Sequence, residues 1–157
     1  MKGALSDILK EIDSLSKGVF MAKHIAWDDS FKVGHPMIDS QHKRLFEIVE
    51  ELYQLILAPE EKREADTTLV LQDCAKYVNF HFTFEENLMR DSKYEEVEAH
   101  LSQHKAFTTY VASLMSDSSR GSKVDLENLY EFLSDWLVKH ICSEDKKLAT
   151  YVSATPQ

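Results

Sequence analysis

Two short segments of the sequence carry histidine and glutamate at a spacing that suits metal binding. His81 and Glu85 lie four residues apart, and so do His100 and His104. Residues four apart in a helix lie on the same face, because the helix completes a turn every 3.6 residues. Imidazole and carboxylate groups held together in this way bind divalent metal ions. The two pairs therefore predict two helices that face a common metal site.

Further candidate ligands are His42, near the middle of the chain's first half, and the pair His140 and Asp145 near its end. Five imidazoles and two carboxylates are more than one ion needs, and two carboxylates suffice to bridge two ions. Imidazole suits iron, zinc, copper and nickel, and the absence of nearby thiolate ligands disfavours Cu(I) and iron-sulfur clusters. Ligand type alone leaves a di-iron and a di-zinc site both open.

The hydrophobic pattern predicts an all-α fold that would position these ligands. Apolar residues recur every three or four positions over 40–57, 61–90 and 94–115, and again after Asp125, a candidate helix cap. A serine-rich loop is expected over 116–123. Short connections favour antiparallel neighbours, so we expect an up-down-up-down four-helix bundle. In that topology the seven candidate ligands fall in one layer, within about 15 Å along the bundle axis.

The N-terminal part of the chain precedes the four expected helices. Residues 1–20 show one apolar stripe, which predicts an extra N-terminal helix that docks on the bundle or pairs with a dimer partner or a signalling domain. Residues 21–38 contain glycine and proline and are expected to form an extended arm, after which Asp39 or Ser40 caps the first bundle helix. We therefore divide the chain into a helical extension, 1–20, and a bundle domain, 21–157.

Composition narrows the range of partners. The 157 residues carry a net charge of −9, which argues against nucleic acid and anionic lipid because both would require a basic face. No stretch is long and apolar enough to cross a bilayer, and no secretory signal is visible, so we expect a cytoplasmic protein without membrane insertion. Cys74 and Cys142 lie among apolar residues and are expected to be buried thiols.

The ligand pattern as a whole resembles the hemerythrins. The motifs that carry the resemblance are His42, His81-x3-Glu85, His100-x3-His104 and His140-x4-Asp145, in this order along the chain. The surrounding segments Trp27-Asp28, Ile38-Asp39-Ser40-Gln41-His42-Lys43 and Trp136-Leu137-Val138-x-His140-Ile141 look like those of the bacterial hemerythrins. The resemblance covers residues 27 to 148 and leaves the first 20 residues outside.

The resemblance implies a non-haem di-iron centre. One iron would take His100, His104 and His140, and the other would take His42 and His81, while Glu85 and Asp145 bridge both irons together with an oxo or hydroxo group. The second iron is then one ligand short, and dioxygen would bind at this place. Leu45, Trp136 and Ile141 occupy the positions that line the oxygen pocket in the family, although periodicity alone interprets them as ordinary core residues.

The spacing of His140 and Asp145 conflicts with regular helix geometry. Five residues of ideal helix rotate by about 140°, whereas Glu144, four residues after His140, would share its face. Helix geometry alone therefore favours Glu144, and the family pattern favours Asp145. Because residues five apart can converge where a helix widens to a single π-type turn, we predict Asp145 as the ligand, with such an irregularity after His140.

Three other polar residues are expected to lie outside the site. His24 and His35 should occupy the surface or loops, and Glu86 should point about 100° away from Glu85, into solvent.

The favoured function is reversible dioxygen binding for delivery, storage or local scavenging. An alternative is an oxygen or redox sensor, in which the same site signals through residues 1–20 or through a domain joined at either terminus. A further alternative is a di-iron peroxidase or oxidase.

Overall fold

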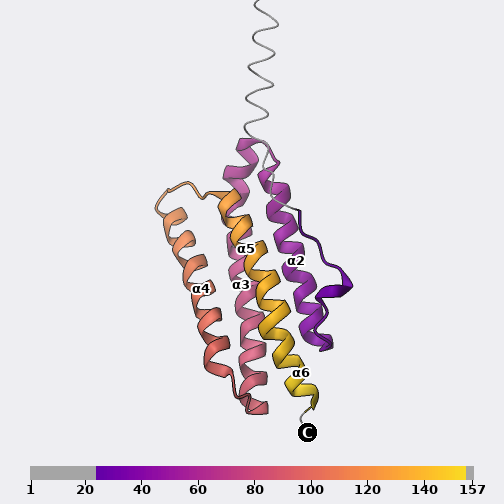
Figure 1. The fold of residues 1–157 in the computed structure, drawn as a ribbon. Helices are drawn as coiled ribbons and strands as arrows, with labels where there is room; N and C mark the ends of the chain where they lie inside the picture. Colours follow the sequence, from indigo (N-terminus) through magenta and orange to yellow (C-terminus); the bar gives the residue numbers. More distant parts are fainter. Residues whose placement is uncertain (1–23, 155–157) are drawn as a thin grey trace, which may run out of the picture.

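The computed structural model describes residues 24–154 and shows a bundle of helices (Figure 1). Its elements are a short 3₁₀ turn Asp29–Phe31, α2 Pro36–Ile56, α3 Glu60–Ser92, α4 Val97–Ser119, α5 Leu126–His140, a π turn Ile141–Asp145 and α6 Lys146–Ala154. The π turn joins α5 and α6 into one continuous rod, which serves as the fourth helix. The predicted all-α bundle with alternating helix directions is confirmed. The N-terminal helix predicted over 1–20 lies outside the described residues.

The first bundle helix begins earlier than the sequence pattern predicts. Helix α2 starts at Pro36, and His35 is its N-cap, with its Nδ1 atom accepting a hydrogen bond from the Ile38 backbone N–H at 3.4 Å. Proline suits the first helical position because its φ angle is already helical and no N–H is needed there. Asp39 instead accepts hydrogen bonds from the backbone N–H groups of Val33 and Gly34. The prediction of Asp39 or Ser40 as the cap is therefore wrong, and Asp39 holds the arm in place.

The arm before α2 is anchored by aromatic packing. Trp27 and Phe31 pack against Phe46 of α2, with ring centroids 5.6 and 4.6 Å from the Phe46 ring. The Ile25 backbone N–H donates a hydrogen bond to the Tyr130 hydroxyl of α5 at 3.0 Å. These contacts tie the arm across two helices and cover one side of the core.

The connections after α3 determine where α4 and α5 begin, and both helices carry candidate ligands. Lys93 ends α3 in a left-handed conformation with φ 57°, and α4 begins at Val97, slightly later than predicted. Helix α4 continues to Ser119, so the predicted loop over 116–123 begins later than expected. Asp125 caps α5 by accepting a hydrogen bond from the Asn128 backbone N–H at 3.0 Å, which confirms the prediction for that end.

The core fills the space between the four helices. Its buried side chains are mainly aliphatic, with Phe46, Phe82 and Phe107 among them. Cys74 belongs to this core, but Cys142 is exposed, so the prediction of two buried thiols is wrong for Cys142. The widened turn around Cys142 alters which residues face inward. Among the described helices, none is both long and apolar enough to span a membrane.

Candidate metal centre

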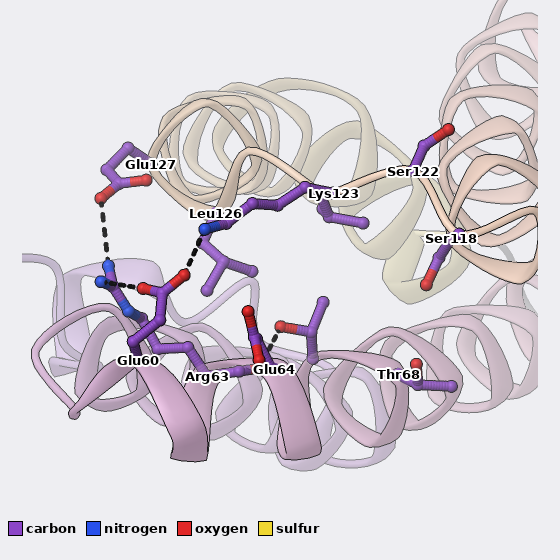
Figure 2. Close-up of a pocket in the computed structure, with 12 residues that line it drawn as sticks. Glu60, Arg63, Glu64, Thr68, Ser118, Ser122, Lys123, Leu126 and Glu127 are labelled. Atoms are coloured by element: carbon purple, nitrogen blue, oxygen red, sulfur yellow. Dashed lines mark hydrogen bonds and ion pairs between the residues drawn. The ribbon is translucent and has the colours of Figure 1, made fainter.

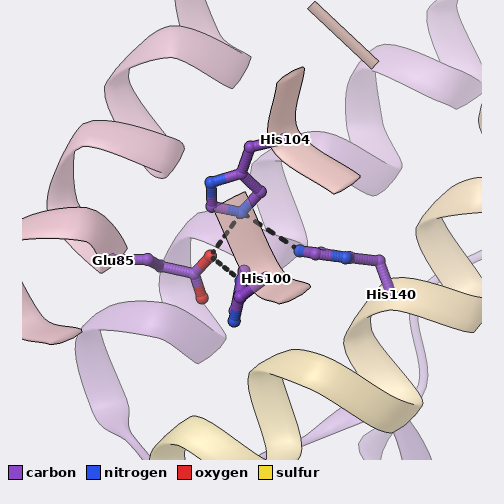
Figure 3. Close-up of side chains that lie close together, drawn as sticks. All are labelled: Glu85, His100, His104 and His140. Carbon is purple, nitrogen blue, oxygen red and sulfur yellow. Dashed lines mark hydrogen bonds and ion pairs between the residues drawn. The ribbon is translucent and has the colours of Figure 1, made fainter. Parts of the chain in front are cut away.

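The seven predicted ligands lie together inside the bundle, each with at most 2% of its surface exposed. Their ligand atoms form two groups, and within each group these atoms lie within 4.8 Å of one another. The first group contains Glu85, His100, His104 and His140 (Figure 3). The second group contains His42, His81, Glu85 and Asp145. Three histidines therefore fall in one group and two in the other, and Glu85 is shared.

In the first group, the Nε2 atoms of His104 and His140 face each other at short range. His104 Nδ1 lies 3.3 Å from Glu86 Oε1, and His140 Nδ1 lies 2.8 Å from Gln103 Oε1. A carboxylate only accepts hydrogen bonds, so the His104 proton lies on Nδ1 and its Nε2 carries a lone pair, whereas the Gln103 amide can turn over and is compatible with either form of the His140 ring. The two Nε2 atoms are nevertheless 3.2 Å apart. Lone pairs on both atoms at this distance would repel each other unless a cation lay between them.

Several ligand atoms have no hydrogen-bond partner within the described part of the chain. They are His100 Nε2, both carboxylate oxygens of Glu85, and Oδ1 of Asp145. Burying such groups without a partner is costly, because they lose their hydrogen bonds to water. Metal ions coordinated by these atoms would compensate for that loss. The residues present therefore fit two metal ions, with imidazole and carboxylate as the ligands.

Asp145 reaches the site because the helix widens before it. Residues Ile141–Asp145 form a π turn, as predicted from the five-residue spacing after His140. The Asp145 carboxylate lies between the two groups: Oδ2 is 2.9 Å from His42 Nε2, and Oδ1 is 3.0 Å from His140 Nε2. Glu144, which a regular helix would bring to the site, instead pairs with Lys147 at 3.3 Å. The π turn thus exchanges one carboxylate for the other.

Burial keeps two of the imidazoles neutral. It lowers the pKa of His81 to about 3 and the pKa of His104 to about 2, with the charge of His100 adding to the effect on His104. At neutral pH both rings therefore retain a lone pair for a metal ion. Burial also lowers the pKa of His100, but the nearby carboxylates of Asp145 and Glu85, each 3.4 Å from His100 Nε2, outweigh burial and raise that pKa to about 9.

The two carboxylates respond differently to the same surroundings. Burial, reinforced by the neighbouring Asp145, raises the pKa of Glu85 to about 8. Burial acts in the same direction on Asp145, but electrostatic attraction to His140 and the nearby imidazole of His100 hold the pKa of Asp145 well below its usual value. The site therefore favours one firmly ionised carboxylate at the place where both groups meet.

Three residues beside the ligands were missed as site residues. Gln41 Oε1 lies 2.9 Å from His81 Nδ1, and Gln103 and Glu86 hold His140 and His104 in the same way. Glu86 is exposed to solvent as expected, with 46% of its side chain accessible, but it also contacts His104, which the sequence did not indicate. Each of the three adjoins a ligand in the sequence, and that adjacency is the signal that could have identified them.

An apolar wall borders the centre. Leu45 and Trp136 line a small cavity of about 20 Å³ together with aliphatic residues and Phe82. Trp136 stacks on the His140 ring with centroids 4.2 Å apart, and Phe82 stacks on His104 at 3.6 Å. Ile141 is buried but lies outside the lining of this cavity. Trp136 also borders a surface hollow of about 400 Å³, so its indole separates the apolar cavity from solvent.

A second pocket, of about 360 Å³, lies near the start of α3 and away from the ligands (Figure 2). Its charged side chains largely pair with one another: Glu60 contacts both Arg63 and Lys123, and Arg63 approaches Glu127 at 4.0 Å. These groups are at least partly exposed to water. Among the described residues that line it, the buried side-chain atom without a hydrogen-bond partner is Arg63 Nε, a donor that cannot bind a metal ion.

Comparison with known proteins identifies the family. The family model described as the hemerythrin HHE cation binding domain matches residues 33–152, which include all seven residues of the centre. The chain belongs to the hemerythrin family. A bacteriohemerythrin from Pseudomonas aeruginosa is 34% identical over 131 residues, covering 83% of this chain and 81% of the relative. A myohemerythrin from Sipunculus nudus is 30% identical over 122 residues, covering 77% of this chain and 88% of the relative.

The fold of this hemerythrin agrees with the family assignment. A crystal structure of wild-type hemerythrin superposes with a TM-score of 0.77 at 26% sequence identity, covering 84% of this chain and 100% of that chain. The match extends over the bundle that holds the ligands. The resemblance inferred from the ligand pattern is therefore confirmed.

Proposed function

We propose that this hemerythrin binds dioxygen reversibly at a di-iron centre. The observation that carries the proposal is the pair of ligand groups, which share Glu85 and contain buried atoms without hydrogen-bond partners. His100, His104 and His140 would hold one iron, and His42 and His81 the other, with Glu85 and Asp145 bridging. An iron pair bound there supplies two electrons to dioxygen in a reversible manner.

The protein's own residues favour binding over turnover. Histidines outnumber carboxylates in the centre by five to two, so the ligands add little negative charge with which to stabilise high-valent iron. Leu45, Phe82 and Trp136 line an apolar cavity, and Phe82 and Trp136 stack on His104 and His140 of the three-histidine group. Such a wall excludes water and protons from bound oxygen. The family members named by the comparisons, a bacteriohemerythrin and a myohemerythrin, support the same proposal.

With Glu85 and Asp145 bridging, the iron held by His42 and His81 would have four protein ligands and the other iron would have five. The group of the former iron holds two histidines where the other group holds three, and both groups share Glu85. The expected open coordination position therefore lies on the side of His42 and His81. His81 is held by Gln41, so one of these two imidazoles is fixed by a hydrogen bond from its other ring nitrogen.

Anaerobic loading with Fe(II), followed by exposure to oxygen and then its removal, tests the proposal. We expect two irons per chain and an optical change that reverses when oxygen is withdrawn. Fewer than two irons per chain would overturn the di-iron assignment. Irreversible oxidation at the first exposure would overturn reversible binding and favour the sensor or the peroxidase and oxidase alternatives. The signalling role of residues 1–20 stays a prediction.

A further inference from the structure

The orienting hydrogen bonds around the centre run in one direction around the bundle. Gln41 of α2 accepts from His81 of α3. Glu86 of α3 accepts from His104 of α4, and Gln103 of α4 accepts from His140 of α5. Helices α2, α3 and α4 thus each supply a candidate ligand and, one residue away in the sequence, the acceptor that holds a histidine of the next helix.

Glu86 differs from Gln41 and Gln103 because it fixes which ring nitrogen of its histidine carries the proton. A glutamine amide can turn over and donate a hydrogen bond, so Gln41 and Gln103 are compatible with either form of the histidine ring. A carboxylate only accepts. His104 must therefore carry its proton on Nδ1, which leaves Nε2 free to face the site.

Glu86 also brings a negative charge to one group only. A hydrogen bond to a carboxylate is about twice as strong as one between neutral groups, and it makes the imidazole a better donor to a metal. Among the described residues, the Nδ1 atoms of His42 and His100 have no hydrogen-bond partner, and His81 and His140 face neutral amides. The three-histidine group is therefore the one with an anionic acceptor.

We propose that Glu86 is a positioning residue that holds His104 in its metal-binding form and makes the iron of the three-histidine group easier to oxidise than the other. The proposal rests on the di-iron function proposed above. Glu86 lies half in solvent, with 46% of its side chain exposed, whereas the His104 side chain is 3% exposed. Substitution of Glu86 therefore leaves the packed core intact.

Three variants separate the hydrogen bond from the charge. Glu86→Ala removes both, Glu86→Gln keeps an acceptor without the charge, and Glu61→Gln removes an exposed charge from the distant first turn of the same helix. The first measurement is Co(II) affinity of the metal-free full chain by competition with a chelator. We expect Glu86→Ala to weaken binding of one of the two ions by about tenfold or more, because residues that orient metal ligands have effects of this size. Glu61→Gln should bind both ions as the unmodified chain does.

The second measurement is the midpoint potential of each iron in the loaded protein. We expect Glu86→Gln to raise the potential of one iron, because the neutral amide donates less charge through His104, and Glu61→Gln to leave both potentials unchanged. If the unmodified chain binds two ions and both Glu86 variants match Glu61→Gln, the role of Glu86 is overturned while the di-iron function stands. If Glu86→Ala shifts the potential and Glu86→Gln does not, the charge of Glu86 is not the cause of the shift. The proposal that this charge makes one iron easier to oxidise is then overturned. If the unmodified chain binds no metal, the proposed function itself fails.

Discussion

The metal centre and the pocket at the start of α3 both gather charged side chains, one inside the bundle and one at its surface. At the pocket, Glu60 pairs with Arg63 and Lys123 while water reaches all three. In the centre, Glu85 is fully buried and neither of its oxygens has a hydrogen-bond partner among residues 24–154. Exposed ion pairs contribute little to stability, whereas buried unpaired groups are costly. This contrast supports the proposal that the buried cluster binds metal ions, whereas the charges at the pocket largely neutralise one another.

The largest effect, on bound iron and on oxygen binding, is expected when a candidate ligand is removed from the buried metal centre. We expect His42→Ala to reduce bound iron from two ions to one and to abolish reversible oxygen binding, because the second group keeps only one histidine. The helical circular dichroism signal should persist, since the core of aliphatic and aromatic residues does not depend on His42. Metal analysis, optical spectra with oxygen and circular dichroism check this. Retained oxygen binding in this variant would show that His42 is not needed for the proposed oxygen site.

Opening the apolar wall should have the next largest effect. Trp136→Ala removes the indole between the cavity and the surface hollow, so water should enter and autoxidation should be faster. Leu45→Ala should act in the same direction and also lower the free energy of unfolding by about 2–5 kcal/mol, as expected for a truncated core leucine. Leu69→Ala, at a leucine with 58% exposure, is the matched control. Equal autoxidation rates in all three variants would exclude the wall as a barrier to water.

The two cysteines should differ in their reactivity toward alkylating reagents, because Cys74 is buried and Cys142 is exposed. Burial raises the pKa of Cys74 to about 12, so this thiol is protonated and inaccessible in the folded protein. Cys142 is exposed in the π turn. We expect an alkylating reagent to modify Cys142 in the native protein and Cys74 only after unfolding, as measured by mass spectrometry of peptides. Rapid native modification of Cys74 would contradict its place in the core.

The smallest effect is expected at the exposed pocket. Glu60→Gln removes the carboxylate shared by Arg63 and Lys123, but water solvates both cations and compensates for most of the loss. We expect a barely changed unfolding midpoint and an unchanged iron content. A large loss of bound iron in this variant would show that the pocket and the metal centre are coupled.

Much of the centre could be predicted from spacing within single helices. His81 with Glu85 and His100 with His104 share helix faces for local reasons, and the bundle topology then brings them to one layer. The helix cap at Asp39 was predicted wrongly because a carboxylate can cap a helix or hold a preceding loop, and local sequence does not distinguish the two. The exposure of Cys142 was missed because a π turn changes the residue that faces the core.

Residue types and their intervals along single helices were sufficient to predict the helical pattern, the candidate ligands and the family resemblance. Only the tertiary structure decided that Gln41, Glu86 and Gln103 each hold a histidine of the following helix, and that Asp145 lies between both groups. Such contacts depend on the relative height and rotation of two helices. Packing of the whole bundle sets these quantities, and no single helix contains them.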